Sequence, residues 1–187
     1  MESDRLKWDD RYANKPAGSP DKFLIDNLHQ LKKPDLLDIA GGNGRNTIPL
    51  ALVGFHVTMI DISQTGIQNT KNQAIENSLS TKTLCLDLDN PEVLKNGIFY
   101  DTIICINFRP EPELLNLIPG LLKPEGIFLL CSFNELQAFE TGFNMQKALK
   151  QHEFINFHPE MELVNYQRFT DITGKRDGYI YKKIKFS

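Results

Sequence analysis

The chain has 187 residues, with 21 Lys and Arg against 24 Asp and Glu, which gives a net charge of −3. Such a balance leaves no cationic face, so the composition excludes a dedicated binder of nucleic acids or of anionic membranes. The longest apolar run has five residues, whereas a membrane span needs ~20. The charged N-terminus argues against a secretory signal, and three widely separated cysteines argue against a disulfide framework. We therefore expect a cytoplasmic protein with a single domain, in which residues 1–30 form a helical cap and residues 35–187 the core.

Along most of the chain, short segments rich in Ile, Val and Leu alternate with segments of helical spacing, which predicts parallel βα units. Strands are expected over residues 36–40, 56–60, 82–88, 102–106 and 127–133. Helices are expected over residues 47–53, 64–77, 114–122 and near 144–150. The first helix must begin near residue 46 or 47 because Pro49 is tolerated only in a first turn, and Ser63 is the expected N-cap of the second.

The C-terminal part of the chain carries a turn and two further strands. Lys123-Pro124-Glu125-Gly126 predicts a turn before the fifth strand. The apolar segments 162–169 and 178–186 are separated by a polar stretch, which predicts a hairpin. The sequence therefore predicts an α/β fold with a doubly wound, mostly parallel seven-stranded sheet, in which the C-terminal hairpin supplies one antiparallel strand.

A glycine-rich turn directly follows the first predicted strand, in the sequence Asp38-Ile39-Ala40-Gly41-Gly42-Asn43-Gly44-Arg45-Asn46. Open α/β sheets bind their ligands outside the carboxyl ends of the strands, and glycines let the backbone approach a ligand closely. A dinucleotide-binding turn would need a glycine where Thr47 stands, and no Gly-Lys-Ser/Thr of a phosphate-binding loop is present. The turn therefore predicts a ligand site of another kind.

Acidic side chains lie at the ends of the first three predicted strands: Asp38, Asp61 and Asp87. A carboxylate at Asp38 would repel a diphosphate and attract an ammonium group. Asp61 can accept hydrogen bonds from both hydroxyls of a ribose. At the third position Asp89 can serve in place of Asp87, and the alternative is that both are solvated. This pattern indicates a ligand that is cationic at one end and carries a ribose and a base at the other.

These motifs resemble those of the class I S-adenosylmethionine-dependent methyltransferases. Residues 37–44 resemble motif I of that family, and residues 121–126 are similar to its turn before the fifth strand. Residues 57–63 and the segment Trp8-Asp9-Asp10-Arg11-Tyr12 look most like the small tellurite-resistance and thiopurine-type branch. The resemblance implies a Rossmann-like methyltransferase fold, S-adenosylmethionine as cofactor and S-adenosylhomocysteine as product. Ala40 departs from the pattern, since the family usually has glycine there.

The resemblance also implies a cofactor site and a neighbouring substrate site. The implied cofactor-binding residues are Trp8, Tyr12, Asp38, Ala40, Gly41, Gly42, Asn43, Gly44, Asn46, Asp61, Ile62, Asp87, Leu88, Cys105, Ile106 and Asn107. In this arrangement Asp61 binds the ribose, Ile62 lies along the adenine, and Asp87 with Leu88 meets the adenine edge. The aromatic residues of the N-terminal segment close the pocket as a lid, and the alternative is a helix that simply packs on the sheet. Phe108 and Arg109 are expected to face the substrate, with Arg109 as a clamp for an anionic group. The alternative for Arg109 is a surface ion pair with Glu111 or Glu113.

Several functional hypotheses follow from this site. In-line methyl transfer depends on proximity and alignment, so no catalytic side chain is assigned, and the histidines show no metal-ligand spacing. Residues 107–110 read Asn-Phe-Arg-Pro and differ from the Asn/Asp-Pro-Pro-Tyr signature of enzymes that methylate amide or adenine nitrogens. We expect a small-molecule or metalloid-oxyanion acceptor, no nucleic-acid or membrane partner, and a monomer or homodimer. The alternatives are a non-catalytic S-adenosylmethionine-binding regulatory protein and a nicotinamide-dependent reductase.

Overall fold

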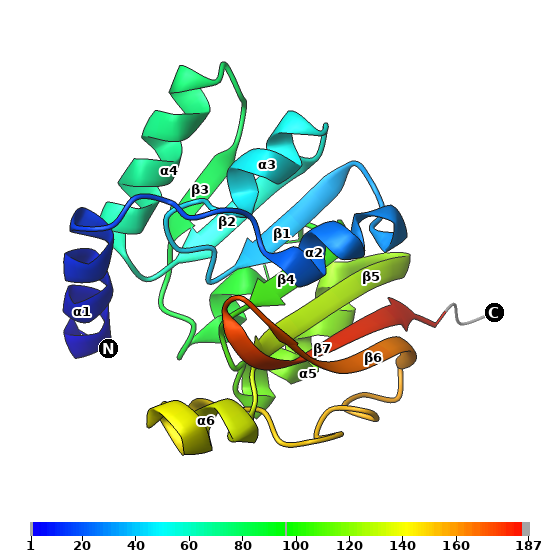
Figure 1. Cartoon of the computed structure of the whole chain (residues 1–187). Coiled ribbons are helices and arrows are strands. Elements are labelled where there is room, and N and C mark those ends of the chain that lie inside the picture. The colour runs from blue at the N-terminus through cyan, green and yellow to red at the C-terminus, as the bar shows by residue number, and fades with distance from the viewer. Residues whose placement is uncertain (1, 96, 185–187) are drawn as a thin grey trace.

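The computed structural model of the protein describes residues 2–95 and 97–184 (Figure 1). Its strands are β1 (Asp35–Ile39), β2 (His56–Asp61), β3 (Lys82–Cys85), β4 (Tyr100–Ile106), β5 (Leu122–Phe133), β6 (Met161–Asp171) and β7 (Gly174–Lys183). Within the described residues they form one sheet in the order β3-β2-β1-β4-β5-β7-β6. The first five strands pair in parallel, and β7 is antiparallel to both of its neighbours. The predicted sheet, with one antiparallel strand from a C-terminal hairpin, is confirmed.

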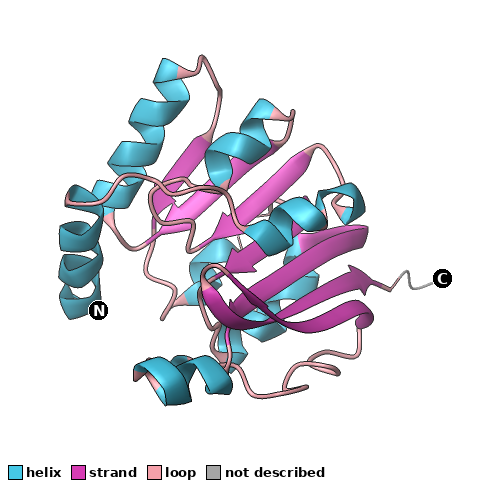
Figure 2. Ribbon diagram, in the orientation of Figure 1, coloured by secondary structure: helices cyan, strands magenta, loops and turns pink. Residues whose placement is uncertain are grey.

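Helices cover both faces of this sheet. They are α1 (Glu2–Ala13), α2 (Lys22–Asp26), α3 (Thr47–Leu52), α4 (Gln64–Glu76), α5 (Pro112–Leu121) and α6 (Glu135–Thr141), with short 3₁₀ turns at Leu28–Gln30, Pro91–Leu94 and Met145–Lys147. Figure 2 shows α2, α3 and α4 on one face of the sheet and α5 on the opposite face. The sheet is therefore doubly wound, as the alternation of strands and helices predicts.

The core consists of two apolar layers, one on each face of the sheet. In β4, Ile103 and Cys105 pack into the layer that contains α5, whereas Ile104 and Ile106 pack into the layer that contains α2 and α3. All four side chains are buried, which explains why β4 is an unbroken apolar run. Burying such a side chain contributes about 1.5–3 kcal/mol to the free energy of unfolding. Because a slip of one residue would move each side chain of β4 to the opposite face, the two layers fix the register of this strand.

Two local predictions at the edge of the glycine-rich turn are confirmed. The Ser63 hydroxyl accepts a hydrogen bond from the Gly66 backbone N–H at 3.0 Å and caps α4. The helix α3 begins at Thr47, so Pro49 lies in its first turn, where a missing backbone N–H leaves no hydrogen bond unmade. Both helices therefore begin beside the carboxyl ends of β1 and β2.

Two predicted boundaries are wrong. The strand β3 ends at Cys85 and not at residue 88, because Asp87 starts a turn in which its carboxylate accepts from the Asp89 backbone N–H at 3.0 Å. The predicted turn at residues 123–126 lies inside β5, where the partners of β4 jump from Leu122 to Ile127 and form a bulge. The predicted end of the last strand at residue 186 lies outside the described residues.

The segment after β5 also differs from the prediction. The expected helix near residues 144–150 is only the short 3₁₀ turn Met145–Lys147. The true helix is α6, which the sequence analysis missed. It is fixed by Asn134, whose side chain accepts from the backbone N–H groups of Leu136 and Gln137. Helical spacing alone did not reveal it, because Leu136 and Phe139 are exposed and α6 has little apolar stripe to bury.

Candidate functional site

The glycine-rich turn lies at the carboxyl end of β1, between β2 and α4. The Gly41 backbone N–H donates to the Ile60 carbonyl at 3.1 Å, which ties the turn to β2. Gly42 has φ +64°, and a Cβ on it would lie 2.6 Å from the Tyr12 hydroxyl oxygen, so only glycine fits. Ala40 also has a positive φ, 55°, at the position where a glycine is expected from the family pattern. The turn therefore holds one strained residue, at a cost of roughly 1–2 kcal/mol.

Asp38 is buried beneath this turn. One of its carboxylate oxygens accepts a hydrogen bond from the Thr47 hydroxyl at 2.7 Å. Burial raises the pKa of Asp38 to about 7, with the nearby carboxylate of Asp61 acting in the same direction. A cationic ligand beside this group would favour its charged form. Asp38 therefore suits a ligand that carries an ammonium or sulfonium group.

Asp61 ends β2 and holds the turn from the other side. Its two carboxylate oxygens accept backbone hydrogen bonds from Gly42 and from Ser63, each at 2.8 Å. Burial raises its pKa in spite of these bonds. Ile62 is a third backbone donor to this carboxylate. Because a carboxylate has about four acceptor positions, one remains for a hydroxyl of a ribose.

The helix α1 lies beside the N-terminal end of α4 (Figure 1). Asp9 makes this contact, since one of its oxygens accepts from the Ser63 hydroxyl at 2.6 Å and from the Thr65 backbone N–H at 2.9 Å. Although burial acts in the opposite direction, these hydrogen bonds hold the pKa of Asp9 below its ordinary value. Trp8 and Tyr12 stack with their ring centroids 5.6 Å apart, and Tyr12 lies against Gly42. Tyr12 therefore lies at the glycine-rich turn, and Trp8 is connected to the turn only through its stacking on Tyr12.

A cleft of about 360 Å³ lies between α1 and the ends of β2 and β3. It is lined by Glu2, Arg5, Ile62, Cys85, Leu86 and Asp87. Two residues expected to border the adenine, Ile62 and Asp87, thus line one cleft. The third, Leu88, packs instead against the apolar layer that contains α5. Three of the residues that line the cleft, Glu2, Arg5 and Asp87, carry charge, and the other three are Ile62, Cys85 and Leu86.

Two asparagines of the turn connect it to the N-terminal segment. The Asn43 side chain donates to the Lys15 carbonyl at 3.3 Å. The Asn46 side chain accepts from the Asp21 backbone N–H at 2.9 Å. Gly44 packs against Thr70 of α4 and leaves no space for a side chain. These side-chain contacts stabilise the shape of the turn and tie it to the N-terminal segment.

The exit of β4 forms the third side of the site. Cys105 and Ile106 are buried, whereas Asn107 is exposed and has φ 58°. Burial raises the pKa of the Cys105 thiol far above its ordinary value, so this thiol is neutral and unreactive at physiological pH. The Asn107 backbone N–H donates to the Cys131 carbonyl at 2.8 Å. The left-handed conformation therefore turns the chain away from the sheet directly after β4.

Arg109 is held by a residue that the sequence analysis did not consider. Its guanidinium makes two hydrogen bonds to the Glu153 carboxylate, at 2.6 and 2.7 Å, and one to the Ala148 carbonyl at 3.1 Å. Although burial acts in the opposite direction, Arg109 holds the pKa of Glu153 below its ordinary value. A substrate anion would have to displace Glu153, so the role of Arg109 as a clamp remains a prediction.

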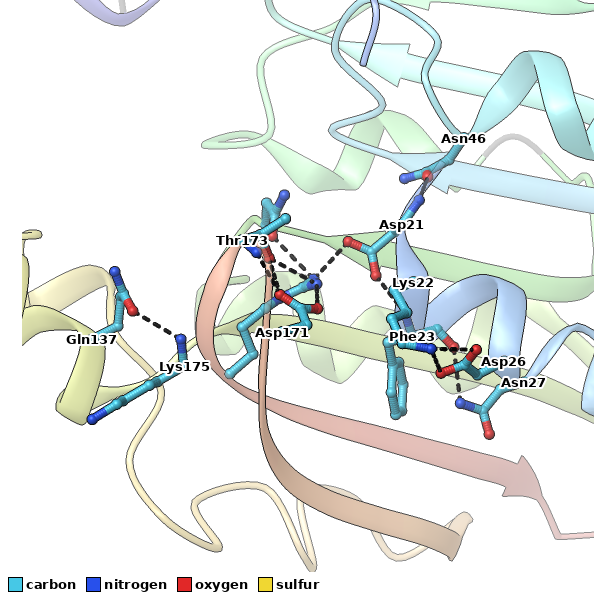
Figure 3. A network of polar contacts seen from close by, with 12 residues as sticks. Asp21, Lys22, Phe23, Asp26, Asn27, Asn46, Gln137, Asp171, Thr173 and Lys175 are labelled. Atoms are coloured by element: carbon cyan, nitrogen blue, oxygen red, sulfur yellow. Dashed lines mark hydrogen bonds and ion pairs between the residues drawn. The ribbon is translucent and has the colours of Figure 1, made fainter. Parts of the chain in front are cut away.

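The sequence analysis missed a buried polar network beside the turn. The Asp21 carboxylate forms ion pairs with two guanidinium groups: that of Arg45, at an N–O distance of 2.6 Å, and that of Arg176 of β7, at 2.8 Å. Arg176 also contacts Asp171 at 3.2 Å and Asn107 at 3.1 Å. Figure 3 shows Asp21 and Asp171 facing the same region from separate parts of the chain. No sequence motif predicts such a network, because its members lie far apart along the chain.

Among the described residues, no group of three or more His, Cys, Asp or Glu side chains is placed to hold a metal ion. In the same part of the chain no helix is long and apolar enough to cross a membrane. The candidate site, called the crevice below, is the edge of the sheet at the carboxyl ends of β1, β2 and β4 together with the cleft beside Ile62. It is built from carboxylates, glycines and aromatic residues.

Comparison with known proteins agrees with this geometry. A protein-family profile described as "Methyltransferase domain" matches residues 36–126, which include the glycine-rich turn and both buried carboxylates. A curated relative from Rickettsia canadensis, named ubiquinone biosynthesis O-methyltransferase, is 30% identical over 178 residues, which cover 87% of this chain and 72% of the relative. The chain belongs to the class I S-adenosylmethionine-dependent methyltransferases.

Solved structures of other methyltransferases share the fold. An S-adenosylmethionine-dependent methyltransferase from Clostridium acetobutylicum has a TM-score of 0.72 at 15% identity, over 98% of this chain and 99% of that one. TehB from Haemophilus influenzae has a TM-score of 0.73 at 17% identity, over 94% of this chain and 67% of that one. At these identities the likeness shows the fold alone. The resemblance to the tellurite-resistance and thiopurine-type branch remains a prediction.

The cofactor of this methyltransferase is S-adenosylmethionine. Because the chain belongs to the methyltransferase family, the alternative of a nicotinamide-dependent reductase is wrong. The residues present fit that group. Asp61 keeps an acceptor position, Asp38 is a buried carboxylate that a cationic group would favour in its charged form, and the cleft beside Ile62 has room for a purine. Which side chains contact the cofactor remains a prediction for each residue named above.

Proposed function

We propose that this methyltransferase acts on a small molecule by in-line methyl transfer. The observation that carries the proposal is the exit of β4, where Asn107-Phe108-Arg109-Pro110 follows the strand in place of the signature for amide or adenine nitrogens. The relative from Rickettsia canadensis is named for ubiquinone biosynthesis, which supports a small organic acceptor. A metalloid oxyanion is the second acceptor class that the sequence pattern favours.

The residues of the crevice have separate roles in this proposal. Bound S-adenosylmethionine supplies a methyl group on a cationic sulfur. Asp38 provides the negative charge for its cationic end, and Asp61 accepts hydrogen bonds from its ribose. Trp8 and Tyr12 cover the turn and exclude water from it. The exit of β4 holds the acceptor in line with the methyl group, where proximity accounts for most of the rate enhancement and no general base is needed.

A transfer assay with a panel of acceptors tests the proposal. Purified protein is incubated with methyl-labelled S-adenosylmethionine and, separately, with catechol, a thiol, a primary amine and the oxyanions selenite and tellurite. Calorimetry with S-adenosylhomocysteine is run on the same preparation. Label transferred to catechol, thiol or amine supports a small-molecule methyltransferase, and label transferred only to an oxyanion supports the second class. Tight binding of S-adenosylhomocysteine without transfer to any acceptor would contradict the proposal and favour the non-catalytic regulatory protein.

A further inference from the structure

Arg176 of β7 is a fully buried arginine beneath the exit of β4. Its Nη2 lies 2.8 Å from an Asp21 carboxylate oxygen and 3.1 Å from the Asn107 side-chain oxygen, while Nη1 lies 3.2 Å from an Asp171 carboxylate oxygen. Figure 3 shows the carboxylates of Asp21 and Asp171 near this point, with dashed lines that converge between them. The guanidinium is therefore held in place from three separate parts of the chain.

The charges in this network are balanced. Arg45 and Arg176 are cationic, and Asp21 and Asp171 are anionic, with the side chains of Asp21 and Arg176 both 0% exposed. A buried ion network of this kind adds little net stability, because desolvation offsets most of the attraction between the charges. Its physical effect is to fix the position of each member. The member that reaches the surface of the crevice is Asn107.

The Asn107 side chain can have only one orientation in this contact. A guanidinium has hydrogen-bond donors and no acceptor, so the Asn107 oxygen must face Arg176 and its amide nitrogen must face the other way. Asn107 is exposed, and its amide nitrogen has no hydrogen-bond partner among residues 2–95 and 97–184. The backbone is fixed by the bond from Asn107 to the Cys131 carbonyl. The strand β4 pairs in parallel with β1, with Cys105 beside Ile39, so Asn107 follows β4 at the same edge of the sheet where the glycine-rich turn follows β1. Its N–H donor is held at that edge by the bond to Arg176.

We propose that Arg176 positions Asn107 as a hydrogen-bond donor to the nucleophilic atom of the methyl acceptor, and that this donor selects oxygen acceptors of the phenolate or carboxylate class. The inference rests on the proposed small-molecule methyltransferase function. A phenolate oxygen has three lone pairs, so it can accept the Asn107 hydrogen bond and still attack. A neutral amine has one lone pair, which a donor would occupy.

The transfer step balances without a protein base. A phenol loses its proton to water before the attack, and the Asn107 donor favours the resulting anion. A lone pair of this oxygen forms the bond to the methyl carbon. The bond between that carbon and the sulfur breaks, and its electron pair stays on the sulfur, which becomes neutral. Asn107 and Arg176 therefore act on the acceptor through orientation and charge.

The test uses Asn107→Asp and Asn107→Ala, with catechol as the oxygen probe and a primary amine as the nitrogen probe. Asp keeps the bond to Arg176 and tolerates the left-handed conformation, but its second oxygen repels an oxyanion. Asn116→Asp is the matched control, since Asn116 is exposed on α5 outside the crevice. Arg176→Lys is measured as a fourth variant, with its fold checked by circular dichroism.

We expect kcat/KM for catechol to fall at least tenfold in both Asn107 variants. The family resemblance implies a cofactor contact for Asn107, whereas this inference assigns its side chain to the acceptor, so the dissociation constant of S-adenosylhomocysteine should stay within twofold. In Asn107→Ala the acid limb of the pH profile for catechol should move to higher pH, a shift that a merely structural defect would not produce. Folded Arg176→Lys should show the same loss, and Asn116→Asp should match the unmodified protein.

Three results would overturn the inference, and they differ from failure of the proposed function. Turnover of the amine but not of catechol, or unchanged catechol kinetics in Asn107→Asp, would contradict the role of Asn107 while leaving a small-molecule methyltransferase. A loss confined to S-adenosylhomocysteine affinity would assign Asn107 to the cofactor instead. If no small molecule accepts the label in the unmodified protein, the proposed function itself fails.

Discussion

Replacing Asp38 by asparagine should make the cofactor-free protein more stable at neutral pH. Asp38 is buried, and burial raises its pKa to about 7. In the unfolded chain the same carboxyl titrates near 3.8. Between these two values the unfolded chain is ionised while the folded protein keeps the proton. Stability is therefore highest at low pH with respect to this group, and is lost as the pH rises through 7. Asparagine mimics the protonated form and has no such loss.

The size of the effect follows from linkage. Each pH unit between the unfolded and folded pKa values changes the free energy of unfolding by ~1.4 kcal/mol. From pH 5 to pH 7 the unmodified protein should lose ~3 kcal/mol relative to Asp38→Asn, and the difference should level off above pH 7. Cofactor binding should respond in the opposite sense, because a cationic ligand needs the ionised carboxylate. Asp38→Asn should bind S-adenosylhomocysteine at least tenfold more weakly at pH 8.

Urea denaturation at pH 5, 6, 7 and 8 measures the first effect, and calorimetry at pH 8 measures the second. Asp26→Asn is the control, since its carboxylate is exposed to solvent and pairs with Lys22. The control should show no growth of the stability difference between pH 5 and pH 7. An Asp38→Asn difference that is equal at pH 5 and pH 7 would refute the argument that burial holds a proton on this group.

Three further predictions concern the turn and the exit of β4. Asp61→Ala should weaken S-adenosylhomocysteine binding at least tenfold, about 1.4 kcal/mol, and calorimetry that finds unchanged affinity in the folded variant would exclude the ribose assignment. Gly42→Ala should weaken the same binding by displacing the aromatic ring above it, whereas Gly18→Ala, with open space around it, should leave the affinity unchanged. Arg109→Ala removes the ion-pair partner of Glu153, so it should lower the free energy of unfolding by roughly 1–3 kcal/mol in urea titrations. Glu153→Gln should lower it by less. Equal stability of the unmodified protein and both variants would contradict the ion pair.

The parts of the fold that the sequence predicts are those set by local rules. The apolar run of β4 reads as a strand buried on both faces, and Ser63 and Pro49 mark the beginnings of two helices. The helix α6 was not predicted from the sequence. Its N-cap residue, Asn134, is held by a hydrogen bond to Asp177 of β7, which lies 43 positions along the chain. The end of β3 was misplaced because its alternation of apolar residues continues into a turn stabilised by Asp87.

In the candidate site, too, the residues set by local sequence patterns are predicted, and those set by contacts between distant segments are not. The turn at Gly42 and the carboxylates Asp38 and Asp61 form a short sequence signature, so their proximity follows from the order of parallel strands. The pairing of Arg109 with Glu153 and the burial of Arg176 follow from contacts between distant segments, which composition and spacing do not encode. The acceptor side of the crevice is thus the part that only the three-dimensional structure reveals.

The buried arginine of β7 has a consequence for the newly made chain. Every residue proposed to bind the cofactor precedes residue 108, whereas Asn107, the proposed donor to the acceptor, is held by Arg176. During synthesis, a nascent chain could complete the first five strands while the partner of Asn107 is still inside the ribosome. Affinity for the nucleoside and competence for methyl transfer should therefore arise at different chain lengths, and the last hairpin decides when the second one begins.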